Sequence, residues 1–105
     1  MATTIIYSKI ARIDLQEIFD FIGKNSLRFA QKEVNEIRQK IKVLKLNLYL
    51  GHRFYEKEDE LTRELVYKNY RIIYNISSDH KQIEILTIHH QARLLANNPA
   101  LNDED

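Results

Sequence analysis

The chain has 105 residues, of which 44% are hydrophobic and 30% are charged, a composition that supports one folded domain. It contains no cysteine, which excludes disulfides and thiolate metal sites, and it has no apolar run of about 18 residues that would form a membrane-spanning helix. Its N-terminal apolar stretch is too short for a signal peptide, so we expect a cytoplasmic protein without membrane contact.

The N-terminal half is predicted to form one strand and two helices. Thr3 to Ser8 (TTIIYS) is typical of a strand, and Ser8 can cap the next helix. Apolar residues recur at helical spacing first at Ala11, Leu15, Ile18 and Ile22, and then at Ala30, Val34, Ile37, Ile41, Leu44 and Leu48. Gly23 is suited to end the first helix, and Asn25 or Ser26 to cap a second helix of about 23 residues. So short a link predicts an antiparallel helical hairpin.

Basic residues are concentrated in the same half of the chain. Residues 1–50 contain nine Lys or Arg against five acids, whereas residues 71–105 contain three against five. On the second predicted helix Arg38, Lys42 and Lys45 repeat at spacings of four and three, which places them in a basic ridge beside the apolar stripe. Such a ridge is either a solvated face or a site for an acidic partner or nucleic acid.

After Gly51 the apolar period falls to two. Residues 61–67, 70–76 and 82–90 are strand-like and are separated by the short turns KN and SSDHK, which predicts an antiparallel meander. The expected fold class is therefore α+β, with an N-terminal strand, an antiparallel helical hairpin and a three-stranded antiparallel meander. One sheet face should receive the helices and the other should be partly apolar. We expect one domain over residues 1–98, with a helical turn in ARLLANN, and an acidic flexible tail over residues 99–105.

Two adjacent histidines, His89 and His90, end the last predicted strand. Neighbouring strand residues point to opposite faces, so these two rings cannot readily share a metal ion, and no metal site is expected. With only Gly23 and Gly51 the chain has no phosphate-cradling loop, so no cofactor is expected. It also lacks a nucleophile motif, so nucleophilic catalysis is not expected.

A cationic group on the predicted sheet is the remaining candidate for chemistry. It comprises Arg63, Arg71, His90 and Arg93. Arg71 lies in a central strand, where a guanidinium needs an anionic partner, either a phosphate or an internal carboxylate from Glu64 or Glu84. The His90 imidazole is suited to proton transfer in RNA cleavage, or to a hydrogen bond with the backbone at the strand end.

The order of these elements resembles the RelE/ParE superfamily of toxins from type II toxin–antitoxin modules. The similar stretches are SKIARIDLQEIFDFI, LGHRF, TRELVYKNYRIIYNI and IEILTIHHQAR, which together cover most of the chain. The resemblance implies the same α+β fold and an antitoxin partner whose acidic C-terminal segment wraps the toxin. The residues expected to bind that partner are Arg38, Lys42, Lys45 and Arg93.

The superfamily contains two kinds of toxin. ParE-like members inhibit DNA gyrase by protein–protein contact, whereas RelE-like members cleave mRNA on the ribosome with strand arginines, a histidine and often a C-terminal tyrosine. For the nuclease alternative the resemblance implies catalytic roles for Arg63, Arg71 and His90. The last tyrosine here is Tyr74, and the net charge is only +1, which favours a non-enzymatic, ParE-like plasmid stabilisation protein.

Overall fold

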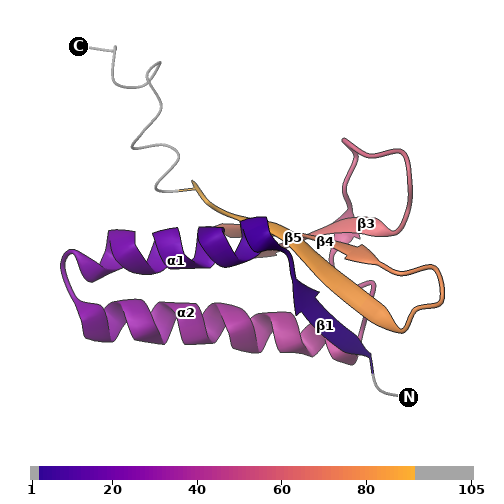
Figure 1. Cartoon of the computed structure of the whole chain (residues 1–105). Helices are drawn as coiled ribbons and strands as arrows, with labels where there is room; N and C mark the ends of the chain where they lie inside the picture. Colours follow the sequence, from indigo (N-terminus) through magenta and orange to yellow (C-terminus); the bar gives the residue numbers. More distant parts are fainter. Residues whose placement is uncertain (1–2, 92–105) are drawn as a thin grey trace, which may run out of the picture.

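The computed structural model describes residues 3–91, which form a helical hairpin on one face of a five-stranded sheet (Figure 1). The predicted α+β class is confirmed. In chain order the elements are β1 (Thr4–Tyr7), α1 (Lys9–Gly23), α2 (Leu27–Lys42), the 3₁₀ turn η1 (Val43–Lys45), β2 (His52–Arg53), β3 (Thr62–Tyr67), β4 (Tyr70–Ile76) and β5 (Gln82–His90).

The strand order in the sheet is β1-β5-β4-β3-β2. Strands β3, β4 and β5 pair antiparallel in sequence order, which confirms the predicted meander. Two features go beyond the prediction. β1 pairs parallel with β5, with Thr4 opposite Gln82, and the two-residue strand β2 adds an edge beside β3. A strand of two residues is too short to show a period in the sequence.

Both helices begin at serine caps, as predicted. The Ser8 Oγ accepts a hydrogen bond from the Ala11 backbone N–H at 2.9 Å, and the Ser26 Oγ accepts one from the Phe29 N–H at 3.1 Å. Each serine satisfies an N–H group that has no partner within its helix. The hairpin is therefore fixed at both helix starts by local sequence.

The second helix is shorter than predicted. Its α-helical part ends at Lys42 and the chain tightens into the 3₁₀ turn η1, so the stripe residue Leu48 lies beyond the helix. There the Leu48 carbonyl accepts a hydrogen bond from the Tyr74 hydroxyl at 2.8 Å. The Leu48 carbonyl is thus used in a tertiary hydrogen bond and not in a further turn of the helix. Gly23 is the last residue of α1 and has no positive φ, so Lys24 and not a left-handed glycine caps that helix.

The hydrophobic core lies between the hairpin and one face of the sheet, which we call the inner face. α1 contributes Ala11, Leu15 and Ile18, α2 and η1 contribute Ile37, Ile41 and Leu44, and the sheet contributes Leu65, Tyr70, Ile72, Tyr74, Ile76, Ile83, Ile85 and Ile88. On the opposite, outer face Ile6 and Val66 are 39% and 55% exposed. The outer face is partly apolar, as expected.

A β-bulge in β5 decides which residues reach the core. Ile73 pairs with Thr87 but the next residue, Tyr74, pairs with Ile85, so β5 carries one extra residue at Leu86. A bulge reverses the alternation of side chains beyond it. Ile85 and Ile88 therefore both face the helices although they are three residues apart.

Helix α1 covers the part of the β5 edge that β1 leaves free. The Asp14 carboxylate accepts hydrogen bonds from the Thr87 Oγ1 at 2.6 Å and from the Ile88 N–H at 2.9 Å, and the Ser8 hydroxyl donates to the Leu86 carbonyl at 2.7 Å. These bonds satisfy backbone groups of an otherwise open strand edge. They also fix the position of α1 along the sheet.

Several predicted features lie outside the described residues, namely the helical turn in ARLLANN, the acidic tail and Arg93. In the part of the chain that is described, neither helix is long and apolar enough to cross a lipid bilayer.

Candidate functional site

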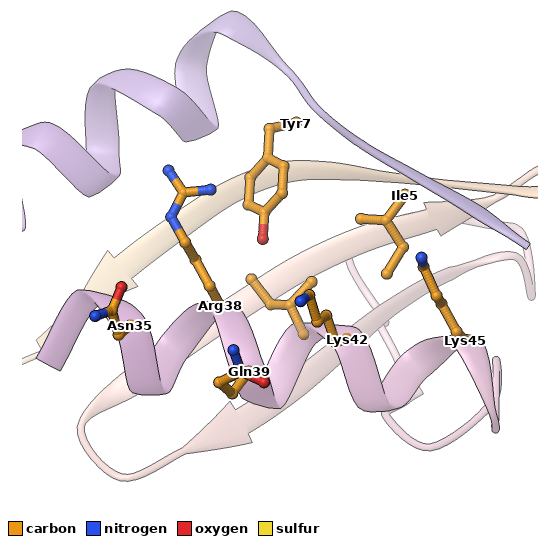
Figure 2. Close-up of a pocket in the computed structure, with 8 residues that line it drawn as sticks. Ile5, Tyr7, Asn35, Arg38, Gln39, Lys42 and Lys45 are labelled. Carbon is orange, nitrogen blue, oxygen red and sulfur yellow. The ribbon is translucent and has the colours of Figure 1, made fainter. Parts of the chain in front are cut away.

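The predicted basic ridge lines a hollow between α2 and β1. Arg38 and Lys42 of α2 and Lys45 of η1 line this hollow together with Ile5 and Tyr7 of β1 (Figure 2). The volume of this hollow is about 350 Å³. It combines three cations with an aliphatic and an aromatic wall, so it fits an anionic group that carries some apolar surface.

Arg38 and Tyr7 form the centre of this hollow. The Arg38 guanidinium carbon lies 5.2 Å from the centroid of the Tyr7 ring, a cation–π distance. Burial raises the pKa of the Tyr7 hydroxyl, although the charge of Arg38 and a hydrogen bond from it act in the opposite direction. At neutral pH this hydroxyl is therefore protonated and remains a hydrogen-bond donor.

The ridge retains its positive charge because no acid neutralises it. Within residues 3–91 none of its three cations forms an ion pair, whereas Lys68 pairs with both Glu33 and Glu36, at 3.5 and 2.7 Å. The nearby strand β1 is a sheet edge, which leaves backbone groups on its far side open to an added strand. The hollow thus presents charge, an apolar wall and a strand edge together.

Arg71 lies on the outer face in an ion pair with Glu64. The Glu64 side chain is only 7% exposed, and its carboxylate also lies 3.5 Å from the Nε2 atom of His52. The same carboxylate raises the pKa of the Arg71 guanidinium. Of the two interpretations of Arg71, the internal pair with Glu64 is the one present in the structure. Directly opposite Arg71 on β5 is His89.

His90 lies on the inner face, beneath the end of α1. Its ring is 4.8 Å from the ring of Tyr70 and meets Phe21 edge-on at 5.6 Å. The Tyr70 hydroxyl donates to the Glu33 Oε1 at 3.0 Å, and burial, followed by the hydrogen bond and charge of Glu33, raises the pKa of Tyr70. His90 is thus packed among aromatic rings that connect the sheet to both helices.

Arg63 is also on the inner face, at the other end of the sheet. Its Nε donates to the Gly51 carbonyl at 2.8 Å, and its guanidinium lies 5.0 Å from the Tyr49 ring. The Tyr74 hydroxyl accepts from the Gly51 N–H at 3.0 Å. Gly51 has no room for a side chain, because an added Cβ would lie 2.6 Å from the Glu64 carbonyl oxygen. Arg63 therefore holds a tightly packed loop.

The predicted site residues thus separate into groups. The structure brings Arg38, Lys42 and Lys45 together, but it places Arg71 on one face of the sheet and Arg63 and His90 on the other. Sequence reasoning identified Glu64 as one of two possible carboxylate partners of Arg71, but it missed His52 and His89 beside this pair. The register of β4 with β5 places His89 opposite Arg71, and the register of β2 with β3 places His52 opposite Glu64. No group of three or more potential metal ligands occurs within residues 3–91.

Comparison with known proteins identifies the fold and the family. The model of a family described as "ParE toxin of type II toxin-antitoxin system, parDE" matches residues 5–95. No sequence among the curated proteins matches the chain.

Solved structures of toxins have the same fold. The chromosomal ParDE toxin–antitoxin system from P. aeruginosa contains a chain with a TM-score of 0.69 and 22% identity, covering 85% of this chain and 96% of that one. A mutant of the E. coli toxin RelE in the free state gives a TM-score of 0.61 at 10% identity, covering 99% and 94%. The toxin–antitoxin complex RelBE2 from Mycobacterium tuberculosis gives 0.53 at 20% identity, covering 88% and 94%. At these identities the structural similarity establishes the fold alone. The family match over residues 5–95 shows that this chain belongs to the ParE toxin family of type II toxin–antitoxin systems.

Proposed function

We propose that this toxin inhibits DNA gyrase by protein–protein contact and is neutralised by an antitoxin whose acidic segment binds in the hollow between α2 and β1. The observation that carries the proposal is the match of the ParE family model to residues 5–95, which is most of the chain. The proposed site residues for the antitoxin are Arg38, Lys42 and Lys45, together with Arg93.

The charge and shape of the hollow support this mode of neutralisation. Arg38, Lys42 and Lys45 have no acidic partner within residues 3–91, so an acidic segment would gain charge-assisted hydrogen bonds without breaking an existing ion pair. Ile5 and Tyr7 supply apolar contact for a neighbouring side chain of the segment. An unfolded acidic segment that becomes ordered on binding suits such a groove.

The arrangement of the arginines and histidines favours gyrase over RNA as the target. Arg63 is occupied by the Gly51 carbonyl, Arg71 is neutralised by Glu64, and His90 is packed against Tyr70. A metal-free nuclease needs its phosphate-binding and proton-transfer groups to meet at one phosphate. Arg71 and His90 lie on opposite faces of the sheet, and so cannot meet in this way.

A ribosome-dependent mRNA endoribonuclease is the second candidate. It is supported by the outer face, where Arg71 lies opposite His89 and pairs with Glu64, whose carboxylate also lies 3.5 Å from the Nε2 atom of His52. An arginine with two histidines could stabilise a phosphorane and transfer protons. If the chain is a nuclease, we therefore assign the proton-transfer role to His89 and His52 in place of His90.

Inducible expression tests the two functions in one culture. Plasmid topology and mRNA 5′ ends are read from the same cells after induction. Gyrase inhibition predicts growth arrest with trapped, cleaved plasmid and intact mRNA. Codon-linked mRNA cuts with unchanged plasmid topology would refute the gyrase proposal and establish the nuclease.

A further inference from the structure

The tip of the helical hairpin contains a second hollow. Residues from the end of α1 and the start of α2 line it. Figure 1 shows that this end of the hairpin points away from β1. Its volume is about 320 Å³, and its lining residues are Phe21, Ile22, Lys24, Asn25, Ser26 and Phe29. None of these residues contributes to the basic ridge or to the outer face.

Large apolar side chains are exposed around this hollow. Leu27 is 65% exposed and Phe29 is 49% exposed, and both lie in the first turn of α2. Burial of side chains of this size is favourable, so two of them exposed beside a hollow form a surface that is suited to a partner. Neither of them belongs to the core.

The charge of the tip is entirely positive. From Phe21 to Lys32 the sequence contains three cations and no acid. Lys24 lies over the Phe21 ring, with 6.0 Å between its Nζ and the ring centroid, and within residues 3–91 neither Lys24 nor Arg28 forms an ion pair. A complementary surface would therefore be acidic, with an apolar side chain at its centre.

We propose that the hairpin tip is the surface with which this toxin docks on its protein target, and that the target presents an apolar side chain surrounded by acidic residues. The inference rests on the proposed function, since it assumes a protein target. The hollow and Leu27 fit an apolar side chain, which a phosphate backbone does not offer.

The position of the tip is consistent with a surface separate from the antitoxin site. Lys42 lies 15 residues after Leu27 in the sequence, a distance of about 22 Å along the helix. Direct competition for the same residues is therefore unnecessary for neutralisation. An antitoxin bound at the ridge would neutralise the toxin by sterically blocking the approach of the target or by sequestering the toxin away from it.

Three purified variants test this inference. Leu27→Glu places an acid in the first turn of α2, where the helix dipole stabilises a negative charge. The double variant Lys24→Glu with Arg28→Glu reverses the charge of the tip. Tyr55→Glu is the matched control, because Tyr55 is 79% exposed and lies in the β2–β3 connection, away from the tip. Each variant is measured for thermal unfolding, for growth arrest on induction and for inhibition of gyrase supercoiling.

We expect both tip variants to unfold like the wild type, to lose growth arrest and to lose at least about tenfold in gyrase inhibition, while Tyr55→Glu retains both activities. Tip variants that arrest growth as strongly as the wild type would overturn the inference. If the wild type arrests growth without inhibiting gyrase, the proposed target is refuted. The tip can still be tested in that case, because growth arrest by the tip variants shows whether the tip is needed for docking on the actual target. A basic tip could instead bind an anionic membrane, which sedimentation with vesicles of equal phosphatidylglycerol and phosphatidylcholine tests. Vesicle binding by the wild type that the tip variants lose would assign the tip to lipid and overturn the inference.

Discussion

Arg71 of β4 lies directly opposite His89 of β5 on the outer face of the sheet. The next residue, His90, lies on the inner face, 4.8 Å from the Tyr70 ring. The two adjacent histidines therefore have different environments, one exposed beside an arginine and the other packed beneath a helix. Substitution of each in turn separates a chemical role from a structural one.

His90→Ala is expected to lower the free energy of unfolding by about 1–3 kcal/mol, because it removes the ring that packs between Tyr70 and Phe21. His89→Ala, at an exposed position, is expected to change it by less than about 0.5 kcal/mol. Urea unfolding measures both. Equal effects of the two substitutions would contradict this assignment. Under the nuclease alternative only His89→Ala should slow mRNA cleavage while the protein stays folded.

Tyr70→Phe removes the hydroxyl that donates to Glu33 at 3.0 Å and leaves a carboxylate that is 9% exposed with the Lys68 ammonium as its remaining partner. We expect a loss of roughly 1–2 kcal/mol in the free energy of unfolding at pH 8, since a buried acceptor loses a hydrogen bond. Tyr55→Phe, at a side chain 79% exposed, is the control and should change stability by less than about 0.5 kcal/mol.

The same variant has a predicted pH dependence. Burial and the neighbouring Glu33 raise the pKa of Tyr70 above the ordinary value of 10.0, so the unfolded chain ionises this tyrosine at a lower pH than the folded chain does. Its contribution to stability is complete below about pH 10 and is lost as the pH rises toward the folded pKa, at up to about 1.4 kcal/mol per pH unit. The difference between wild type and Tyr70→Phe should therefore shrink above pH 10. A difference that is the same at pH 8 and pH 11 would disprove this linkage.

The two glycines differ in how much space surrounds them. An added Cβ at Gly51 would lie 2.6 Å from a backbone oxygen, whereas at Gly23 it would lie 3.2 Å from the Cδ2 atom of Leu27, a side chain that can move. We expect Gly51→Ala to cost about 1–3 kcal/mol of unfolding free energy. Gly23→Ala should stabilise the protein by up to about 1 kcal/mol, because alanine favours the helix. Chemical denaturation of both variants checks the contrast, and an equal loss at the two positions would refute it.

Charge reversal on α2 tests the proposed antitoxin site. Arg38→Glu and Lys42→Glu are each expected to weaken binding of the purified antitoxin by about tenfold, because each replaces an attraction to an acidic segment by a repulsion. The weakening should be largest at low ionic strength. Lys81→Glu, at an exposed position in the β4–β5 turn, is the control. Calorimetric titration measures the affinities, and unchanged affinity in both ridge variants would exclude the ridge as the binding site.

Much of this fold follows from local sequence. The serines before each helix, the spacing of apolar residues in α1 and α2, and the period of two in β3, β4 and β5 are local signals, and each predicted the element that the structure contains. The row formed by Arg38, Lys42 and Lys45 could also be predicted, because residues three and four apart share one helix face whatever surrounds the helix.

Only the tertiary structure decided which residues meet across the sheet. Strand alternation by itself showed that His89 and His90 face opposite ways, but the pairing register of β4 and β5 placed His89 and not His90 beside Arg71. The bulge at Leu86 reverses the alternation along β5. The Leu86 carbonyl accepts a hydrogen bond from the Ser8 hydroxyl, and the Ile88 N–H donates one to Asp14 of α1, so both partners of the bulged segment are distant in the sequence. The choice of Glu64 as the partner of Arg71, and the parallel pairing of β1 with β5, likewise depend on contacts that no local pattern encodes.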